Sequence, residues 1–184
     1  FVMIRDHAFA VHGISEMSFA GAALALLLGY DVVTGSMVGS IVSALLIGIL
    51  GVKKHDSNSV IGALMPFGLG LGILFLSLYQ GRSANKFSLL TGQIVSVDAD
   101  QLGNMIGGAI VIITILVLVW RPLSFASLDP EVAHAKGVPM RALSLVFMVV
   151  LGIAVALSVQ VVGSLLVLAL LITPAAAAMQ VTAS

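Results

Sequence analysis

The chain has 184 residues, of which 60% are hydrophobic and 9% are charged. Soluble domains carry about 25% charged residues, so this composition is typical of a protein that crosses a membrane several times. Eight basic residues balance eight acidic ones, which argues against nucleic-acid binding, and the absence of cysteine excludes disulfides, thiolate metal sites and cysteine nucleophiles.

The first apolar segment, Ala8–Leu28, has the length of a membrane-spanning helix but carries an acid near its middle. An ionised side chain at that depth costs roughly 2.5–3.5 kcal/mol, so Glu16 requires an explanation. His12 lies four residues earlier and therefore on the same helix face. Carboxylate oxygen and imidazole nitrogen are ligands for zinc, manganese and iron. We therefore predict that His12 and Glu16 form a transient binding site for a divalent cation.

Three other interpretations of this pair stay open. In the first, His12 and Glu16 form an ion pair or hydrogen bond that only stabilises the bundle. In the second, Glu16 is protonated, because burial favours the neutral carboxyl group. In the third, the pair carries protons in a secondary transporter. An intramembrane metalloprotease is rejected, because its H-E-x-x-H motif requires a second histidine where this chain reads H-G-I-S-E. We expect no enzymatic activity.

The apolar segments together predict an all-α, polytopic transmembrane helical bundle with about six spans. The expected spans are Ala8–Gly29, Gly35–Val52, Ile61–Tyr79, Leu102–Trp120, Ala142–Gln160 and Gly163–Met179. Small residues are frequent in them, as in GLGLG at Gly68–Gly72, so we expect close helix packing. Pro66 and Pro174 fall inside apolar segments and are expected to kink or break their helices.

Lysine and arginine near the ends of the spans predict their orientation. One side of the membrane receives six of them and the other side two: Arg5, Lys53, Lys54, Arg121, Lys136 and Arg141 against Arg82 and Lys86. The side with six is predicted to be the cytoplasm. It includes the N-terminal segment and the loop Arg121–Arg141, whereas Gly81–Asp100 lies outside and is the best candidate for contact with an external partner.

The inner loop is predicted to contain a short helix. Asp129 suits an N-cap and Pro130 the first helical position, with Glu131 in the first turn. Gly137 suits the end of the helix. These residues predict a short amphipathic helix at roughly Pro130–Lys136 on the cytoplasmic side. Such a helix either docks into a partner protein or lies on the lipid surface.

Four segments of the chain, in the same order, resemble the metal-uptake ABC transporter permeases for zinc, manganese or iron. They are FVMIRDHAFAVHGISEMSFAGAA, LLTGQIVSVDADQL, RPLSFASLDPEVAHAKGVPMR and VGSLLVLALLITPAAAA. The resemblance implies a homodimeric permease in the cell membrane that moves a divalent transition metal inward. A separate cytoplasmic ATP-binding subunit drives it and an extracytoplasmic metal-binding protein delivers the ion. The metal is the transported substrate, and no cofactor is expected.

The resemblance also implies a role for the predicted loop helix. The segment Asp129–Gly137 matches the part of the permease that inserts into the ATPase cleft, which assigns ATPase coupling to a set of residues, namely Asp129, Pro130, Glu131, Ala133 and Gly137. The chain has no G-x-x-x-x-G-K-[ST] phosphate loop, so ATP hydrolysis is expected on the partner subunit. Family members commonly exceed six spans, so we expect this chain to be a fragment of one longer permease domain.

The chain departs from the family pattern at the first motif. Many members carry an aspartate followed four residues later by a histidine, where this chain has His12 and then Glu16. The spacing is kept and the ligand types are swapped, a combination that is compatible with zinc, manganese and iron alike. Two alternative functions are a proton- or ion-coupled secondary transporter and an ABC permease for a metal chelate. A chelate requires a wide apolar cavity rather than intramembrane ligands, so the pair argues mildly against the latter.

Overall fold

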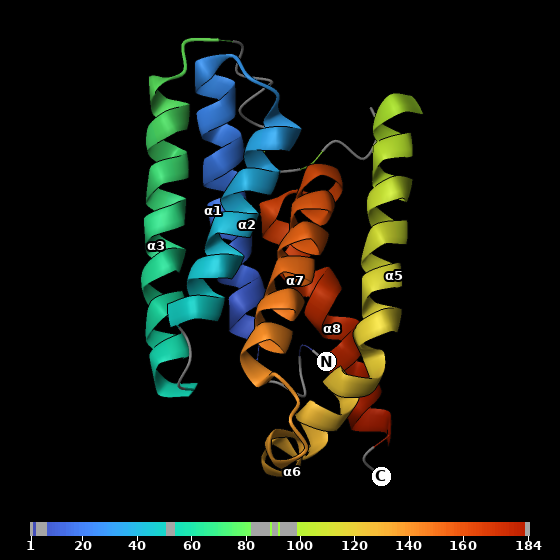
Figure 1. Ribbon diagram of the computed structural model, residues 1–184. Helices are drawn as coiled ribbons and strands as arrows, with labels where there is room; N and C mark the ends of the chain where they lie inside the picture. The colour runs from blue at the N-terminus through green and yellow to red at the C-terminus, as the bar shows by residue number, and fades with distance from the viewer. Residues whose placement is uncertain are drawn as a thin grey trace.

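The computed structural model describes residues 2, 7–50, 54–81, 89, 92 and 99–182, and the ordered elements in these ranges are all helices. Six long helices run side by side in alternating directions, and a short one lies at one end of the bundle (Figure 1). Their bounds are α1 Ala8–Leu28, α2 Val32–Leu50, α3 Lys54–Leu78, α5 Ala99–Leu128, α6 Pro130–Ala135, α7 Met140–Val162 and α8 Ser164–Thr182. The predicted all-α bundle is confirmed.

Five of these helices are long and apolar enough to cross a membrane. They are α1, α2, α7 and the apolar parts of α3 and α5, which are Asn58–Leu78 and Leu102–Leu128. The sixth expected span corresponds to α8, which contains a shorter apolar stretch, Ala169–Gln180. The six predicted segments are therefore all helical, and six is an approximate number of spans.

The structure corrects the predicted end of the fourth span. Helix α5 does not stop at Trp120 but continues through Pro122 to Leu128. The extension is stable because Leu123 and Ala126 are buried in a cluster with α7 side chains. Much of the expected loop Arg121–Arg141 is therefore helical.

Pro66 and Pro174 were expected to kink or break their helices, and the expectation of a break is wrong, while that of a kink stays a prediction. Helices α3 and α8 continue through these prolines. A proline leaves the backbone carbonyl of the preceding turn without its amide donor. In membrane bundles neighbouring helices, Ser or Thr side chains and ordered water commonly supply a partner. Proline at these positions is therefore compatible with continuous helices.

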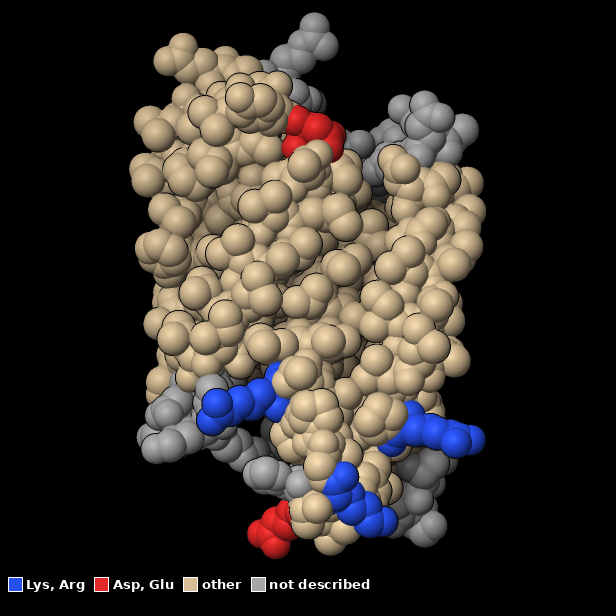
Figure 2. All heavy atoms as spheres, in the orientation of Figure 1, with Lys and Arg blue, Asp and Glu red and all other residues tan. Residues whose placement is uncertain are grey.

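On the face that Figure 2 shows, the coloured Lys, Arg, Asp and Glu side chains lie toward the two ends of the bundle, and none is seen in the band between them. The exposed cations Arg121, Lys136 and Arg141 lie toward the end that carries α6. Their side of the bundle is the one that the lysine and arginine distribution assigned to the cytoplasm. Of the other residues used for that assignment, Lys54 begins α3, whereas Arg5, Lys53, Arg82 and Lys86 lie outside the described residues.

Helix α1 is the centre of the bundle, since it packs against α2, α3, α7 and α8. Its residues Ala10, Val11 and Ile14 belong to the main hydrophobic core, which α2, α3, α7 and α8 complete. Of all described spans, α1 is the most buried and α5 the least. Most side chains in the middle of α1 are therefore enclosed by neighbouring helices rather than by lipid.

Glycines allow α1 and α2 to touch through their backbones. A methyl group added at Gly21 would lie 3.0 Å from the Cα of Gly39, and one added at Gly39 would lie 3.1 Å from the carbonyl carbon of Met17. Across the same interface the hydroxyl groups of Ser18 and Ser36 are 2.7 Å apart. In lipid the hydrophobic effect does not drive helices together, because the lipid tails are as apolar as the side chains. Helices there usually associate through small residues and hydroxyl hydrogen bonds.

We expect Gly39→Ala to lower the free energy of unfolding by about 1–3 kcal/mol, because the added methyl group forces α1 and α2 apart. Thermal unfolding in detergent measures this. The matched control is Gly62→Ala on α3, where a methyl group meets no described atom within 4 Å. The control should be neutral or slightly stabilising, because alanine favours the helix by about 1 kcal/mol over glycine. Equal losses in both variants would contradict the role of close packing.

The turn between α1 and α2 is defined by two residues. Gly29 has a φ of 75°, in the left-handed region that glycine adopts without strain, and ends α1. Asp31 then caps α2, since its Oδ2 accepts hydrogen bonds from the hydroxyl and the amide of Thr34 at 2.6 and 2.9 Å. These hydrogen bonds lower the pKa of Asp31. The capping interaction is therefore fully present above the unfolded pKa of about 3.9 and is lost as the pH falls through the lowered pKa.

Removing this cap should weaken the fold modestly. We expect Asp31→Ala to cost about 1 kcal/mol of stability, because the first turn of α2 loses its side-chain acceptor. Asp31→Asn should retain most of the stability, because the amide oxygen accepts the same hydrogen bonds. Thermal unfolding in detergent at neutral pH compares the two, and an asparagine variant as unstable as the alanine variant would show that the charge, not the cap, is what matters.

Candidate functional site: the His12–Glu16 pair

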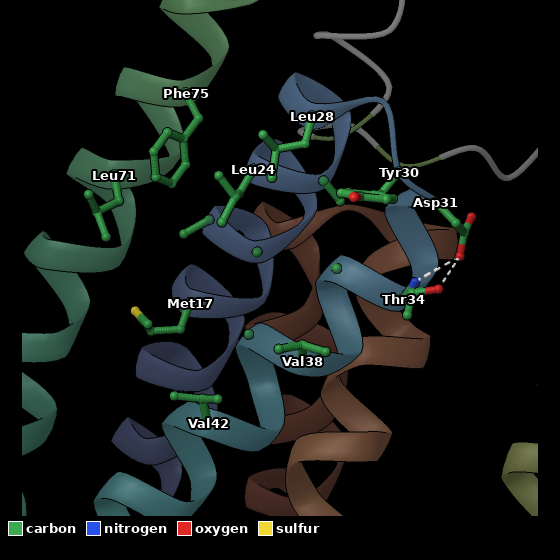
Figure 3. Close-up of a pocket in the computed structure, with 15 residues that line it drawn as sticks. Met17, Leu24, Leu28, Tyr30, Asp31, Thr34, Val38, Val42, Leu71 and Phe75 are labelled. Carbon is green, nitrogen blue, oxygen red and sulfur yellow. Dashed lines mark hydrogen bonds between the residues drawn. The ribbon is translucent and has the colours of Figure 1, made fainter.

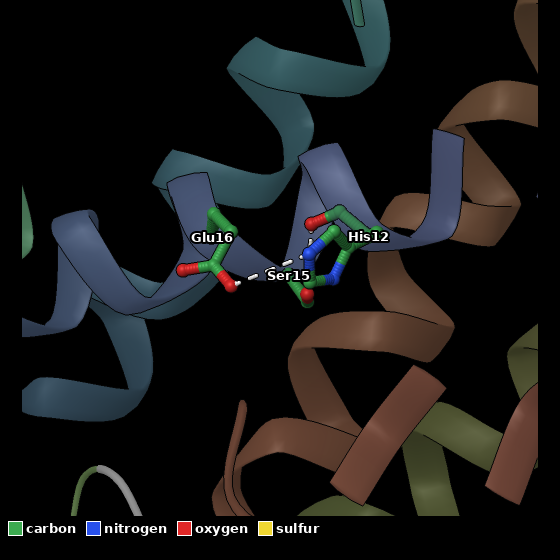
Figure 4. Close-up of polar contacts among 3 residues, drawn as sticks. All are labelled: His12, Ser15 and Glu16. Carbon is green, nitrogen blue, oxygen red and sulfur yellow. Dashed lines mark hydrogen bonds and ion pairs between the residues drawn. The ribbon is translucent and has the colours of Figure 1, made fainter. Parts of the chain in front are cut away.

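The predicted pair lies on one face of α1 and its members face each other (Figure 4). His12 Nε2 and Glu16 Oε1 are 3.9 Å apart. The Glu16 side chain is 7% exposed and that of His12 is 32% exposed, so the acid is enclosed and the imidazole reaches the edge of the packed interior. The structure therefore brings together the two residues that the sequence singled out.

Both residues keep an unused polar atom. Glu16 Oε2 and His12 Nδ1 are buried and have no hydrogen-bond partner among the described residues. Buried polar atoms are normally satisfied, and leaving one without a partner costs about 1–3 kcal/mol. Ser15 does not fill either position, because its hydroxyl donates to the carbonyl oxygen of His12 at 2.8 Å. Glu16 Oε2 is therefore a free acceptor among the described residues, whereas His12 Nδ1 would be an N–H donor when Nε2 binds a cation.

The separation within the pair suits one shared metal ion. A bond from zinc to imidazole nitrogen is about 2.0–2.1 Å long and one to carboxylate oxygen about 2.0–2.2 Å, so the two together span at most about 4.3 Å. At 3.9 Å, both atoms reach one ion that lies nearly between them. Among the described residues, His12 and Glu16 are not joined by a third histidine or acid to form a metal cluster. Two ligands hold a cation weakly, which suits passage more than storage.

A second feature, the outer groove, lies between α1, α2 and α3 (Figure 3). It has a volume of about 560 Å³ and its wall is almost entirely apolar, with Leu24, Val38 and Phe75 among the lining side chains. Polar groups border it at one end, where Tyr30, Asp31 and Thr34 lie. Neither His12 nor Glu16 lines this groove, so it is separate from the pair.

The short helix predicted in the inner loop is present as α6. Asp129 Oδ1 accepts a hydrogen bond from the amide of Val132 at 3.1 Å, which confirms Asp129 as the N-cap. The helix begins at Pro130 and ends at Ala135, one residue before the predicted Lys136. Gly137 follows with a φ of 80°, so the expected stop signal has the left-handed conformation of a helix C-cap.

Helix α6 is fastened to the bundle by one side and open on the other. Ala133 is fully buried in a cluster with Leu123 of α5 and Phe147 of α7. Glu131 and Gly137 are exposed. Among the residues assigned to coupling, Ala133 thus attaches α6 to the bundle and Asp129 caps it. Glu131 and Gly137 form its exposed surface.

Sequence reasoning did not single out Phe147, which lies between the two predicted sites. Its ring belongs to the cluster around Ala133 and is 5.9 Å from the ring of His7, the residue that precedes α1. Packed side chains therefore connect α6 to the start of the helix that carries His12 and Glu16. An aromatic residue inside an apolar span gives no sequence signal of such a position.

The whole chain, residues 1–184, matches the model of one protein family, described as the ABC 3 transport family. The chain belongs to this family. The resemblance seen in the four sequence segments is thus confirmed, and the protein is a multi-pass protein of the cell membrane.

Relatives and a solved structure agree with this assignment. The chain is 28% identical over 183 residues to the manganese transport system membrane protein MntC of Halalkalibacterium halodurans, covering 99% of this chain and 63% of that protein. It is 29% identical over 181 residues to the manganese import system permease protein ScaB of Streptococcus parasanguinis, covering 97% and 64%. The structure of PsaBC from Streptococcus pneumoniae in complex with Fab has a TM-score of 0.80 and 29% identity, covering 96% of this chain and 64% of that one.

These comparisons show what kind of protein the relatives are and how much of their length this chain covers. The two relatives are named as membrane components of transport systems rather than as enzymes. The chain spans a little under two thirds of their length.

Proposed function

We propose that this chain is the membrane-spanning part of an ABC importer that moves a divalent transition metal into the cytoplasm. The observation that carries the proposal is the His12–Glu16 pair, held 3.9 Å apart inside the most enclosed span of the bundle. Relatives named for manganese transport support manganese as the first metal to test. No resident cofactor is proposed, because the metal is the cargo.

In this proposal the pair is an intermediate binding site for the ion on its way through the membrane. Glu16 supplies negative charge at a depth where a bare cation would otherwise be expensive, and His12 supplies a neutral nitrogen ligand. Two ligands bind the ion strongly enough to draw it in and weakly enough to let it leave. A homodimer, which we propose from the family resemblance, places two such pairs in one assembly.

The proposed partners occupy opposite ends of the bundle. A cytoplasmic ATP-binding subunit docks on α6, and the positive side chains near that end support its cytoplasmic location. An extracytoplasmic metal-binding protein delivers the ion at the other end. The segment Gly81–Asp100, expected to contact that protein, falls largely outside the described residues. ATP hydrolysis takes place on the partner subunit.

The pair is tested by uptake into liposomes that contain the complete permease with its ATP-binding subunit. We expect Glu16→Gln and His12→Ala each to reduce ATP-dependent manganese uptake about tenfold or more, because each removes one of two ligands to the ion. Zinc and iron uptake measured in parallel identifies the preferred metal. The control is Ser77→Ala, an exposed hydroxyl on α3 that bonds only to its own helix at Leu74.

Two results would contradict the proposal in different ways. Normal uptake by both variants would leave His12 and Glu16 as a structural pair. Uptake that persists without ATP and follows a proton gradient would favour the secondary transporter instead.

The role proposed for α6 predicts uncoupling. Glu131→Gln removes a charge from its exposed face, and Gly137→Ala forces a side chain into a left-handed conformation at a cost of about 1–2 kcal/mol. We expect both variants to assemble and to hydrolyse ATP while importing several-fold less metal per ATP, measured in the same liposomes. Asp31→Asn, which removes one charge at the opposite end, is the control and should leave the ratio unchanged. A ratio equal to that of the wild type in both α6 variants would overturn the docking role.

A further inference from the structure

The backbone of α3 touches the backbone of α1 directly at Glu16. A methyl group added at Gly68 would lie 2.9 Å from the carbonyl carbon of Glu16, 2.9 Å from the amide nitrogen of Met17 and 3.2 Å from the Cβ of Glu16. Ordinary van der Waals contacts of such a group lie at 3.4–4 Å. Only glycine therefore lets α3 approach Glu16 this closely.

The neighbouring glycines of the same GLGLG motif have different surroundings. A methyl group at Gly70 would meet no described atom within 4 Å, because this residue faces away from the bundle. One at Gly72 would collide with the ring of Phe19, lying 3.3 Å from its Cζ and closer to two other ring carbons. The motif thus contains one glycine against the acid, one against an aromatic ring and one in open space.

We propose that Gly68 is a positioning residue that sets where Glu16 presents its carboxylate to the transported ion. This inference rests on the proposed function of the pair. The peptide that joins Glu16 to Met17 lies against α3, so the closeness of the two helices fixes the depth and the tilt of the Glu16 side chain. A bulkier residue at position 68 moves this peptide by several tenths of an ångström.

The geometry of the pair makes such a movement matter. Two metal–ligand bonds of this kind span at most about 4.3 Å, and the atoms that would share the ion are already 3.9 Å apart. A displacement that lengthens this distance by about half an ångström leaves one ligand out of reach. Functional sites in general need their ligands within about 0.5 Å of the productive geometry.

The test compares the three glycines in liposomes that contain the complete permease and its ATP-binding subunit. The measured quantity is the concentration of manganous ion, added as the chloride, that gives half-maximal ATP-dependent uptake. We expect Gly68→Ala to raise this concentration about tenfold, the range seen when support around a metal ligand is removed. Gly70→Ala should leave it unchanged. Gly72→Ala should lower the melting temperature but leave the half-saturating concentration of manganous ion unchanged.

A double mutant separates positioning from simple packing. If Gly68 acts through the carboxylate, Gly68→Ala added to Glu16→Gln should raise the half-saturating concentration no further than Glu16→Gln does alone. Multiplying effects would show that Gly68 acts independently of the Glu16 carboxylate, and would overturn the inference. An effect of Gly68→Ala no larger than that of Gly70→Ala would overturn it as well.

The remaining outcomes also decide the matter. If Glu16→Gln leaves the half-saturating concentration unchanged, the pair is not the ion site, and the proposed function of the pair fails together with the inference. If Gly68→Ala does not assemble, Glu16→Asp replaces it, because this variant retracts the carboxylate by one methylene group without touching Gly68. A raised half-saturating concentration in Glu16→Asp supports the narrow reach on which the inference depends, and an unchanged one overturns it.

Discussion

The structure depends on the direct backbone contact of α1 with its two neighbours. Glycines on α2 and α3 remove the side chains that would hold the helices apart, so α1 lies between them at close range. In a bilayer this contact provides packing where the hydrophobic effect provides none. It also creates an interior in the middle of a single span, and Glu16 lies in that interior rather than facing lipid.

Enclosure explains how an acid persists at this depth. Glu16 is surrounded by protein, has His12 as its neighbour on the same face and retains one oxygen without a partner among the described residues. A purely structural pair would be expected to satisfy both carboxylate oxygens. The unpartnered oxygen of Glu16 and the neighbouring imidazole of His12 are the observations that support the proposed ion site.

The sequence predicted the features that depend on local chemistry. Spacing placed His12 and Glu16 on one face, and cap residues located α6 to within one residue of its end. Features that depend on tertiary contacts were missed. The continuation of α5 past Pro122 depends on burial of Leu123 and Ala126, which no local pattern encodes. The three glycines of GLGLG look equivalent in the sequence, and only the position of α1 distinguishes them.

The attachment of α6 has a mechanical consequence. Ala133 is fully enclosed by side chains of α5 and α7, so the short helix is packed against both of these long helices. A load applied to its exposed surface is borne by both long helices at once. Since Phe147 of α7 also touches His7, part of that load arrives at the root of α1, on the same helix as the acid. A movement of α6 is therefore expected to move α5, α7 and the start of α1 together.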